Sequence, residues 1–170
     1  MVRSLWFSLL LGIGLVLGSA PSHAGTVRLP KVGDPAFSVD VPTGWTYDYD
    51  QYDNLQFLAS DHSTALQLSM IVSPEVATTP LSSVAANVFK SAGAQPYTRN
   101  EPSTLAGHTG EAFYGDLVVN NRTLHMKVVL AKMDNSHIAA LSTVVEDGAT
   151  PEQIAALNAL IGLVQLSDPQ

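Results

Sequence analysis

The segment at residues 47–54, Tyr-Asp-Tyr-Asp-Gln-Tyr-Asp-Asn, concentrates the side chains best suited to binding chemistry. Its aromatic and acidic members, which we take as a candidate contact surface, are Tyr47, Asp48, Tyr49, Asp50, Tyr52 and Asp53. Tyrosine combines an apolar ring with a hydroxyl group, so such a cluster could contact a protein or a sugar. The same pattern also suits a solvated strand end and turn, and both interpretations stay open at this point.

Three carboxylates within six residues, Asp48, Asp50 and Asp53, could instead hold Ca²⁺, a hard cation that prefers oxygen ligands. An EF-hand loop that began at Asp48 would need glycine at its sixth position and glutamate at its twelfth. Asp53 and Ala59 occupy these positions. The sequence therefore argues against an EF-hand and leaves a small-ligand or divalent-cation (Ca) binding protein as the alternative function.

The other residues with metal or catalytic chemistry do not form a recognisable set. The histidines beyond residue 24 are His62, His108, His125 and His137. No two of them have the i, i+4 spacing of helical zinc ligands. Met70, Met126 and Met133 could suggest copper, but core packing is the better interpretation for Met126. Without a cysteine, a Gly-x-Ser-x-Gly motif or a phosphate-binding loop, we predict no enzyme, no catalytic residue, no metal ligand and no cofactor.

The charge balance excludes some partners. The 170 residues include 8 basic and 15 acidic side chains, for a formal net charge of −7. Nucleic acid is bound mainly through Lys and Arg contacts to phosphate, so we predict no nucleic-acid partner. The same excess of acid discourages binding to an anionic membrane surface. With no cysteine, the fold must be stabilised by burial rather than by disulfide bonds.

Residues 1–24 are typical of a secretory signal peptide. Arg3 supplies the positive start, residues 5–17 form an apolar run, and Ser22-His23-Ala24 offers a cleavage site after Pro21. A membrane-spanning helix needs roughly 20 apolar residues, more than this run contains. We therefore expect cleavage after Ala24, no membrane span in the remaining chain, and export, with the periplasm favoured over secretion.

The rest of the chain is expected to form an N-terminal leader at residues 25–35 and a single domain at residues 36–166. The leader carries two prolines and no clear periodicity, so we expect it to lie on the surface or to pair loosely. Residues 37–41 alternate between apolar and polar side chains, which predicts a half-buried strand. Further strands are predicted at 55–59 and 66–72, joined by a hairpin loop at 61–63.

Two amphipathic helices are predicted. The first covers residues 80–92, with Thr79 as its N-cap and Gly93 placed to end it. The second runs from 151 to 164, with Thr150 and Gln153 as a capping box. Each helix has one apolar stripe and therefore needs a surface to cover.

Between the helices, strands at 109–119, 122–132 and 137–145 are predicted to form an antiparallel meander. Asparagine tolerates positive φ, so Asn120 and Asn121 suit a two-residue hairpin turn. The resulting register places Val119 opposite Arg122, Asp116 opposite His125, and Phe113 opposite Val128.

Both faces of this meander are largely apolar. We expect one face to carry Phe113, Leu117, Leu124, Met126, Val128, Leu130, Leu141 and Val145. We expect the other to carry Ala112, Val118, Val129, Ala131, Ile138, Ala140 and Val144. A sheet that is apolar on both faces should be covered on both, and the two helices are the available covers. This predicts an α+β fold, an α/β/α sandwich with a central, mainly antiparallel sheet flanked by helices.

Residues 37–45, Phe-Ser-Val-Asp-Val-Pro-Thr-Gly-Trp, form a strand followed by Pro-x-Gly-Trp. After them come two strands, a helix beginning near Pro80, Leu105-Ala106-Gly107 entering the meander, and a closing helix. In these features the chain resembles the PsbP-like and DcrB-like superfamily of exported α/β/α sandwich proteins, over about 130 residues. The resemblance implies an accessory or binding role, as in photosystem accessories and envelope proteins, without selecting one.

The combined expectation is an exported, non-enzymatic accessory or protein-binding domain of the bacterial cell envelope. Its partner would be an unidentified envelope protein. The sheet and helices would serve as a rigid platform, with the segments at 47–54 and 133–137 as contacts.

Overall fold

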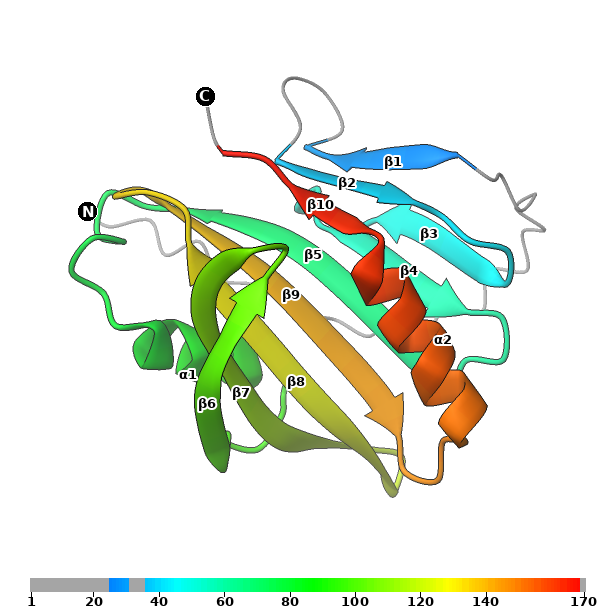
Figure 1. Cartoon of the computed structure of the whole chain (residues 1–170). Helices are drawn as coiled ribbons and strands as arrows, with labels where there is room; N and C mark the ends of the chain where they lie inside the picture. The colour runs from blue at the N-terminus through cyan, green and yellow to red at the C-terminus, as the bar shows by residue number, and fades with distance from the viewer. Residues whose placement is uncertain (1–24, 31–35, 169–170) are drawn as a thin grey trace.

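A seven-stranded antiparallel sheet forms the centre of the molecule in the computed structural model, which describes residues 25–30 and 36–168 (Figure 1). In spatial order its strands are β3 (Trp45–Tyr49), β4 (Leu55–Ala59), β5 (Thr64–Val72), β9 (His137–Glu146), β8 (Arg122–Lys132), β7 (His108–Val119) and β6 (Arg99–Leu105). Two meanders therefore meet where β5 pairs with β9. The predicted signal peptide at 1–24 lies outside the described residues, as do residues 31–35 of the predicted leader.

A second, three-stranded sheet consists of β1 (Thr26–Leu29), β2 (Phe37–Asp40) and β10 (Val164–Leu166), with β2 in the middle. The expectation that the leader pairs loosely is wrong for its described part. Strand β1 pairs with β2 along its whole length, and both Val27 and Leu29 are buried. A four-residue strand followed by a proline is too short for its alternation to stand out in the sequence.

The two helices cover opposite faces of the large sheet. Helix α1 (Leu81–Ser91) contacts β7 and β8, whereas α2 (Pro151–Gly162) contacts β5. The three-stranded sheet lies on the same face as α2, and β1 packs against β5 (Figure 1). The predicted α+β sandwich is confirmed, and the small sheet is an additional part of one cover.

Each face of the large sheet carries its own apolar core. The core on the α1 face contains Ala85, Val88, Phe89, Phe113, Met126, Val128, Leu130, Ile138, Ala140 and Val144. The core on the α2 face contains Val27, Phe37, Trp45, Leu55, Phe57, Leu66, Leu68, Ala112, Val129, Leu141, Leu157 and Leu160. Burial on both faces explains why the strands at the middle of the sheet read as continuous apolar runs.

The predicted faces are correct for β7 and β8 but inverted for β9. Leu141 lies beside Val129 on the α2 face, and Val144 lies beside Met126 on the α1 face. The pairing of Lys132 with Ile138 sets this register across the loop between the two strands. Side chains alternate with a period of two, so an error of one residue in that loop moves every β9 side chain to the wrong face.

The hairpin between β7 and β8 agrees with its prediction. Asn120 and Asn121 have φ values of +50° and +63°, and a two-residue hairpin turn of type I′ requires positive φ at both positions. All three predicted pairs, which are Val119 with Arg122, Asp116 with His125, and Phe113 with Val128, are present in the register.

The ends of α1 show one correct and one wrong prediction. Gly93 ends the helix with φ of +71°, and the N–H groups of Gly93 and Ala94 donate to the carbonyls of Lys90 and Phe89, which is a Schellman motif. Thr79 does not cap the N-terminus. Its hydroxyl donates to the Glu75 carbonyl instead, at 2.8 Å, and Pro80 occupies the N-cap position without a side-chain hydrogen bond.

At α2 the predicted capping box is present, but the helix ends at Gly162 rather than at the predicted residue 164, and Val164 begins β10. The Thr150 N–H donates to Gln153 Oε1 at 2.7 Å, and the Gln153 N–H donates to Thr150 Oγ1 at 3.4 Å. Gln153 Nε2 also donates to Asp61 Oδ2 at 2.8 Å, which ties the helix to the β4–β5 loop. Hydrogen bonds from Ser63 and then Gln153 lower the pKa of Asp61 to about 2.

Replacing Thr150 by alanine is expected to lower the free energy of unfolding by about 1 kcal/mol, since an N-cap hydroxyl satisfies a helix N–H that otherwise has no partner. Urea unfolding followed by circular dichroism measures the change. Thr150→Ser keeps the hydroxyl and should stay close to the parent. Equal stability of the alanine variant and the parent would show that this cap contributes nothing.

Candidate contact surface at the edge of the sheet

The aromatic and acidic segment predicted as a contact surface forms strand β3 and the loop that follows it, at one edge of the large sheet. Tyr47 and Tyr52 are 39% and 48% exposed. Asp48 and Asp53 are also exposed, whereas Tyr49 and Asp50 are half-buried. The structure thus separates the six residues into four that face solvent and two that build the segment.

Tyr49 joins the two sheets. Its hydroxyl donates to the backbone carbonyl of Arg28 in β1 at 2.6 Å, and its ring packs against the core on the α2 face. Burial raises the pKa of this hydroxyl above its ordinary value. Tyr49 therefore positions β3 against the small sheet and is a poor candidate for contact with a partner.

Asp50 holds the loop between β3 and β4. Its Oδ1 accepts from the N–H groups of Tyr52 and Asn54 at 2.8 and 2.9 Å, and its Oδ2 accepts from Asn54 Nδ2 at 2.8 Å. Both carboxylate oxygens are thus committed to the turn, in which Asp53 has φ of +60°. Within the described part of the chain, no three His, Asp or Glu side chains come together in a group that could hold a metal ion.

Tyr47 is held at the surface by a contact with the neighbouring strand β4. It lies opposite Phe57 of β4, and the two ring centroids are 6.4 Å apart with a tilted geometry. Phe57 is itself fully buried in the α2-face core. The exposed ring is therefore pre-positioned by core packing, which lowers the entropic cost of using it in a contact.

The histidines and methionines are dispersed. His62 lies in the β4–β5 loop, His108 begins β7, and His125 and His137 lie on β8 and β9. Met126 is buried on the α1 face, as predicted from its register, whereas Met70 and Met133 pack against the core on the α2 face. The methionines therefore lie on opposite faces of the sheet and do not form one copper-binding set.

His125 lies between two carboxylates at the end of the sheet opposite the β8–β9 loop. Its Nδ1 is 2.9 Å from Asp116 Oδ1, and its Nε2 is 3.7 Å from Asp147 Oδ1. The hydrogen bond with Asp116 is the main cause that raises the pKa of His125 above its ordinary value. The pair confirms the predicted cross-strand charge contact between Asp116 and His125.

Because the pKa of His125 is raised in the folded state, its protonation stabilises the fold below pH 6.5, and this contribution is lost as the pH rises through the raised pKa. We expect His125→Gln to be less stable than the parent at pH 5.5, by no more than about 1 kcal/mol since the pair is exposed, and equal to it at pH 9. Urea midpoints at the two pH values measure this. His108→Gln is the control, and a His125→Gln deficit that grows towards pH 9 would contradict the assignment.

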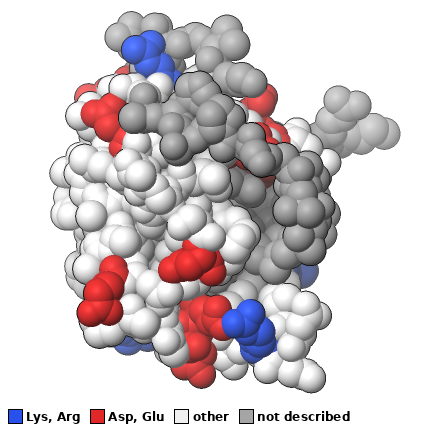
Figure 2. Space-filling model, turned by 90° about the vertical axis from the view of Figure 1, so that its right-hand side faces the viewer, with Lys and Arg blue, Asp and Glu red and all other residues white. Residues whose placement is uncertain are grey.

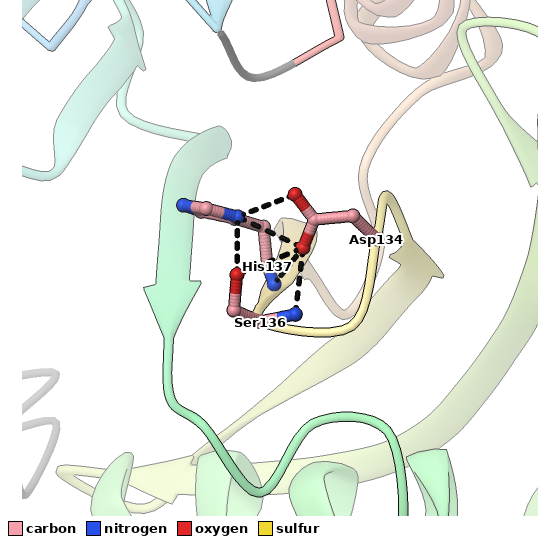
Figure 3. Close-up of polar contacts among 3 residues, drawn as sticks. All are labelled: Asp134, Ser136 and His137. Atoms are coloured by element: carbon pink, nitrogen blue, oxygen red, sulfur yellow. Dashed lines mark hydrogen bonds and ion pairs between the residues drawn. The ribbon is translucent and has the colours of Figure 1, made fainter.

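The β8–β9 loop brings Asp134, Ser136 and His137 together, as Figure 3 shows. Asp134 Oδ1 accepts from the N–H groups of Ser136 and His137 at 2.6 and 2.7 Å, and Asp134 Oδ2 is 2.7 Å from His137 Nδ1. These contacts, the Ser136 N–H first, lower the pKa of Asp134 to about 2. They brace the loop at residues 133–137, which was predicted as a contact.

The same three residue types serve as a catalytic triad elsewhere, but the geometry here differs. In a triad the serine hydroxyl bonds to Nε2 of the histidine and the aspartate bonds to Nδ1. Here Ser136 Oγ and Asp134 both lie within 3.0 Å of Nδ1 of His137. His137 therefore cannot accept the Ser136 proton at Nε2 while Asp134 holds its Nδ1–H, and the three residues stabilise the turn instead of forming a triad.

A surface cluster at the other edge of the sheet was not predicted from the sequence. The Arg99 guanidinium lies over the Tyr114 ring, 3.9 Å from its centroid, and the Tyr114 hydroxyl donates to Glu101 at 2.5 Å. This hydrogen bond raises the pKa of Tyr114. The strand that carries Arg99 and Glu101, β6, has no alternating pattern, so nothing in the sequence indicated that it would pair with β7.

Several solved structures share this arrangement of elements. Neither a protein-family model nor a curated protein matches the sequence. The solution structure of cyanobacterial PsbP (CyanoP) from Synechocystis sp. PCC 6803 is similar, with a TM-score of 0.57 at 11% identity over 89% of this chain and 99% of that one. The Ran-binding protein Mog1p of Saccharomyces cerevisiae gives a TM-score of 0.52 at 13% identity, over 85% and 95%.

A structure from Bacteroides thetaiotaomicron VPI-5482 gives a TM-score of 0.51 at 10% identity and covers 78% of this chain. This chain spans only 45% of that protein's length. At such identities the likeness concerns the fold. The chain has the fold shared by PsbP, Mog1 and DcrB-like proteins, and the resemblance found in the sequence is confirmed at this level. Within the described residues, no helix is long and apolar enough to cross a membrane.

Proposed function

We propose that this chain is an exported, non-enzymatic accessory domain of the bacterial cell envelope that binds another envelope protein. The contact surface is the edge of the large sheet that carries Tyr47, Asp48, Tyr52 and Asp53. The observation that carries this proposal is the pair of exposed tyrosine rings, flanked by exposed carboxylates, on strand β3 and the loop that follows it, which Tyr49 and Asp50 hold in place. Exposed aromatic side chains on a rigid support are typical of protein contact sites.

Two further observations support the proposal. The sequence of residues 1–24 is typical of a signal peptide, which supports export to the periplasm. Mog1p, which shares the fold, is described as a Ran-binding protein, so this architecture serves protein binding in at least one case. A fold alone does not establish a function, so the argument rests on the exposed surface of this chain.

Photocrosslinking in the bacterial cell tests the surface directly. A photoreactive phenylalanine analogue is placed at position 47 or 52 of the full chain, and the control carries it at Val118, which is 58% exposed on a different part of the sheet. We expect one discrete adduct from positions 47 and 52 in the periplasmic fraction and none from 118. The same bands from all three positions, or no adduct from 47 and 52, would overturn the proposal.

Export has its own readout in the same cells. We expect the periplasmic protein to begin at Gly25, which mass spectrometry of the intact chain resolves. A protein that stays in the cytoplasm with residues 1–24 attached would overturn the envelope role.

A further inference from the structure

Strand β3 is the last strand at one edge of the large sheet, so one of its sides pairs with β4 and no strand among the described residues is paired with the other. The hydrogen bonds at its two ends fix which residues point each way. The Ser60 N–H donates to the Gly44 carbonyl, and the Asp50 N–H donates to the Asn54 carbonyl.

In an antiparallel pair, hydrogen-bonded positions alternate with positions whose N–H and C=O groups point away. Because Gly44 and Asp50 both bond towards β4, Thr46 and Asp48 do so as well. The backbone groups of Trp45 and Tyr47 therefore point out of the sheet. Of these two residues Tyr47 is exposed and Trp45 is buried, so the outer side is open to an approaching chain at Tyr47.

The two edges of the sheet differ in how they discourage pairing. At the opposite edge, β6 carries Pro102, which has no N–H to donate, and the charged side chains of Arg99 and Glu101. Proline and charge are the usual devices that keep an edge strand unpaired. Strand β3 contains neither proline nor a basic residue, and Asp48 is its one charged side chain.

We propose that β3 pairs with an extended, basic segment of the partner, which adds an eighth strand to the large sheet. This inference rests on the proposed function and specifies how the partner is bound. Main-chain hydrogen bonds to Trp45 and Tyr47 would supply the attachment, and the side chains of β3 would select the segment. Strand β3 spans five residues, and a segment of similar length would fill it.

The charge of the surrounding chain selects a basic partner. Residues 36–89, which include β2 to β5, hold six acidic residues and no Lys or Arg. Figure 2 shows the side of the molecule on which the β2–β3 turn lies, where carboxylates and a few Lys or Arg side chains are spread over a mostly uncharged surface. A second copy of this chain would bring its own Asp48, Asp50 and Asp53 against the same strand, and like charges placed across a strand pair are destabilising.

The alternation of side chains defines the pattern that the segment should have. Tyr47 lies on the α2 face with Trp45 and Phe57, so Thr46 and Asp48 lie on the other face. On a paired strand, every second residue would lie next to Asp48 and Thr46, and the residues between them would lie next to Tyr47. Lys or Arg suits the first set, and a β-branched or aromatic residue suits the second.

A synthetic peptide tests this proposal against the purified chain beginning at Gly25. The probe is fluorescent Thr-Lys-Val-Lys-Val-Lys-Thr, and its controls are the same peptide with Glu in place of Lys and an analogue N-methylated on the valines and another on the lysines. We expect saturable binding of the first peptide, at least tenfold weaker binding of the Glu peptide, and the same loss for one methylated analogue but not for the other, because only alternate N–H groups of the segment face β3. No binding of the Lys-Val peptide, or equal binding of both methylated analogues, would overturn the proposal.

A substitution in the chain provides the second arm. Tyr47→Pro removes an outward N–H without breaking the ladder to β4, whereas Tyr47→Val removes the ring and keeps the N–H. We expect Tyr47→Pro to weaken binding at least tenfold and at least threefold more than Tyr47→Val does. Equal effects would show that the ring, and not strand pairing, carries the contact. If Tyr47→Pro does not fold, the methylated peptides carry the test with the parent chain.

The failure of this inference is distinguishable from the failure of the proposed function. A specific photocrosslink from position 47 in cells, together with no peptide pairing, would leave protein binding standing and overturn strand addition. Peptide pairing without any cellular adduct would overturn the envelope role, but the inference that β3 pairs with an extended basic segment would stand.

Discussion

Replacing Phe113 by alanine is expected to lower the free energy of unfolding by about 3–5 kcal/mol. Phe113 is fully buried on the α1 face, and its ring and that of Tyr97 form a T-shaped contact with centroids 5.0 Å apart. Tyr97 in turn meets Phe89 of α1 at 6.0 Å. Truncation of Phe113 would leave a cavity between the sheet and α1, at a cost that is a large part of the 5–15 kcal/mol typical of a domain.

Urea unfolding followed by tryptophan fluorescence and circular dichroism measures this loss. Val118→Ala is the matched control, because Val118 lies on the same strand with an exposed side chain and should change stability by less than about 0.5 kcal/mol. A Phe113→Ala variant within 1 kcal/mol of the parent would contradict the packing of α1 on β7.

Replacing Gly110 by alanine is expected to lower the free energy of unfolding by about 3 kcal/mol or more. This is the upper end of the roughly 1–3 kcal/mol that overpacking typically costs. A Cβ at this position would lie 2.0 Å from the Leu130 carbonyl oxygen and 3.1 Å from the Ala131 Cα. Both atoms are backbone in the paired strand β8 and cannot rotate away. The β7–β8 ladder would have to separate locally, next to the hairpin with β6.

Thermal unfolding and soluble yield measure this effect. Gly162→Ala is the control because a Cβ there meets nothing within 4 Å, and alanine favours the helix more than glycine by up to about 1 kcal/mol. We expect the two alanine variants to change stability in opposite directions. A Gly110→Ala variant as stable as the parent would show that β7 and β8 approach less closely than described.

Long, periodic segments were predictable from the sequence, and short ones were not. The β7–β8 hairpin was predicted with its register because Asn120 and Asn121 define the turn length and both strands are long. Strands β1 and β10 have four and three residues and acquire their pairing only from β2 between them. A strand that depends on a partner distant in sequence leaves little local pattern.

Sterically demanding details also lay beyond the sequence. Gly110 falls within the strand predicted at 109–119, but only the structure shows that β8 leaves no room for a side chain there. Gly115 was not singled out, although a Cβ there would come within 2.8 Å of the Phe89 ring and would obstruct α1. Such constraints come from contacts between elements that are distant in the sequence. The local sequence around each glycine therefore does not predict them.

The candidate surface was predictable as composition but not as geometry. The spacing of the tyrosines and aspartates identified residues 47–54, and the sequence could not separate the exposed Tyr47 and Tyr52 from the structural Tyr49 and Asp50. That distinction depends on β1, which supplies the carbonyl to which Tyr49 donates. The open edge depends on the strand order of the whole sheet, which no single segment encodes.

Hydrogen exchange at individual amides of β3 tests the central claim, an open edge that a partner completes, most directly. In the free protein we predict a protected Asp48 amide, which points to β4, and a Tyr47 amide that exchanges at nearly the unprotected rate. With the Lys-Val peptide at saturation, exchange of the Tyr47 amide should slow at least tenfold while Asp48 stays protected. A Tyr47 amide already protected in the free protein, or unchanged in the saturated complex, would contradict the account.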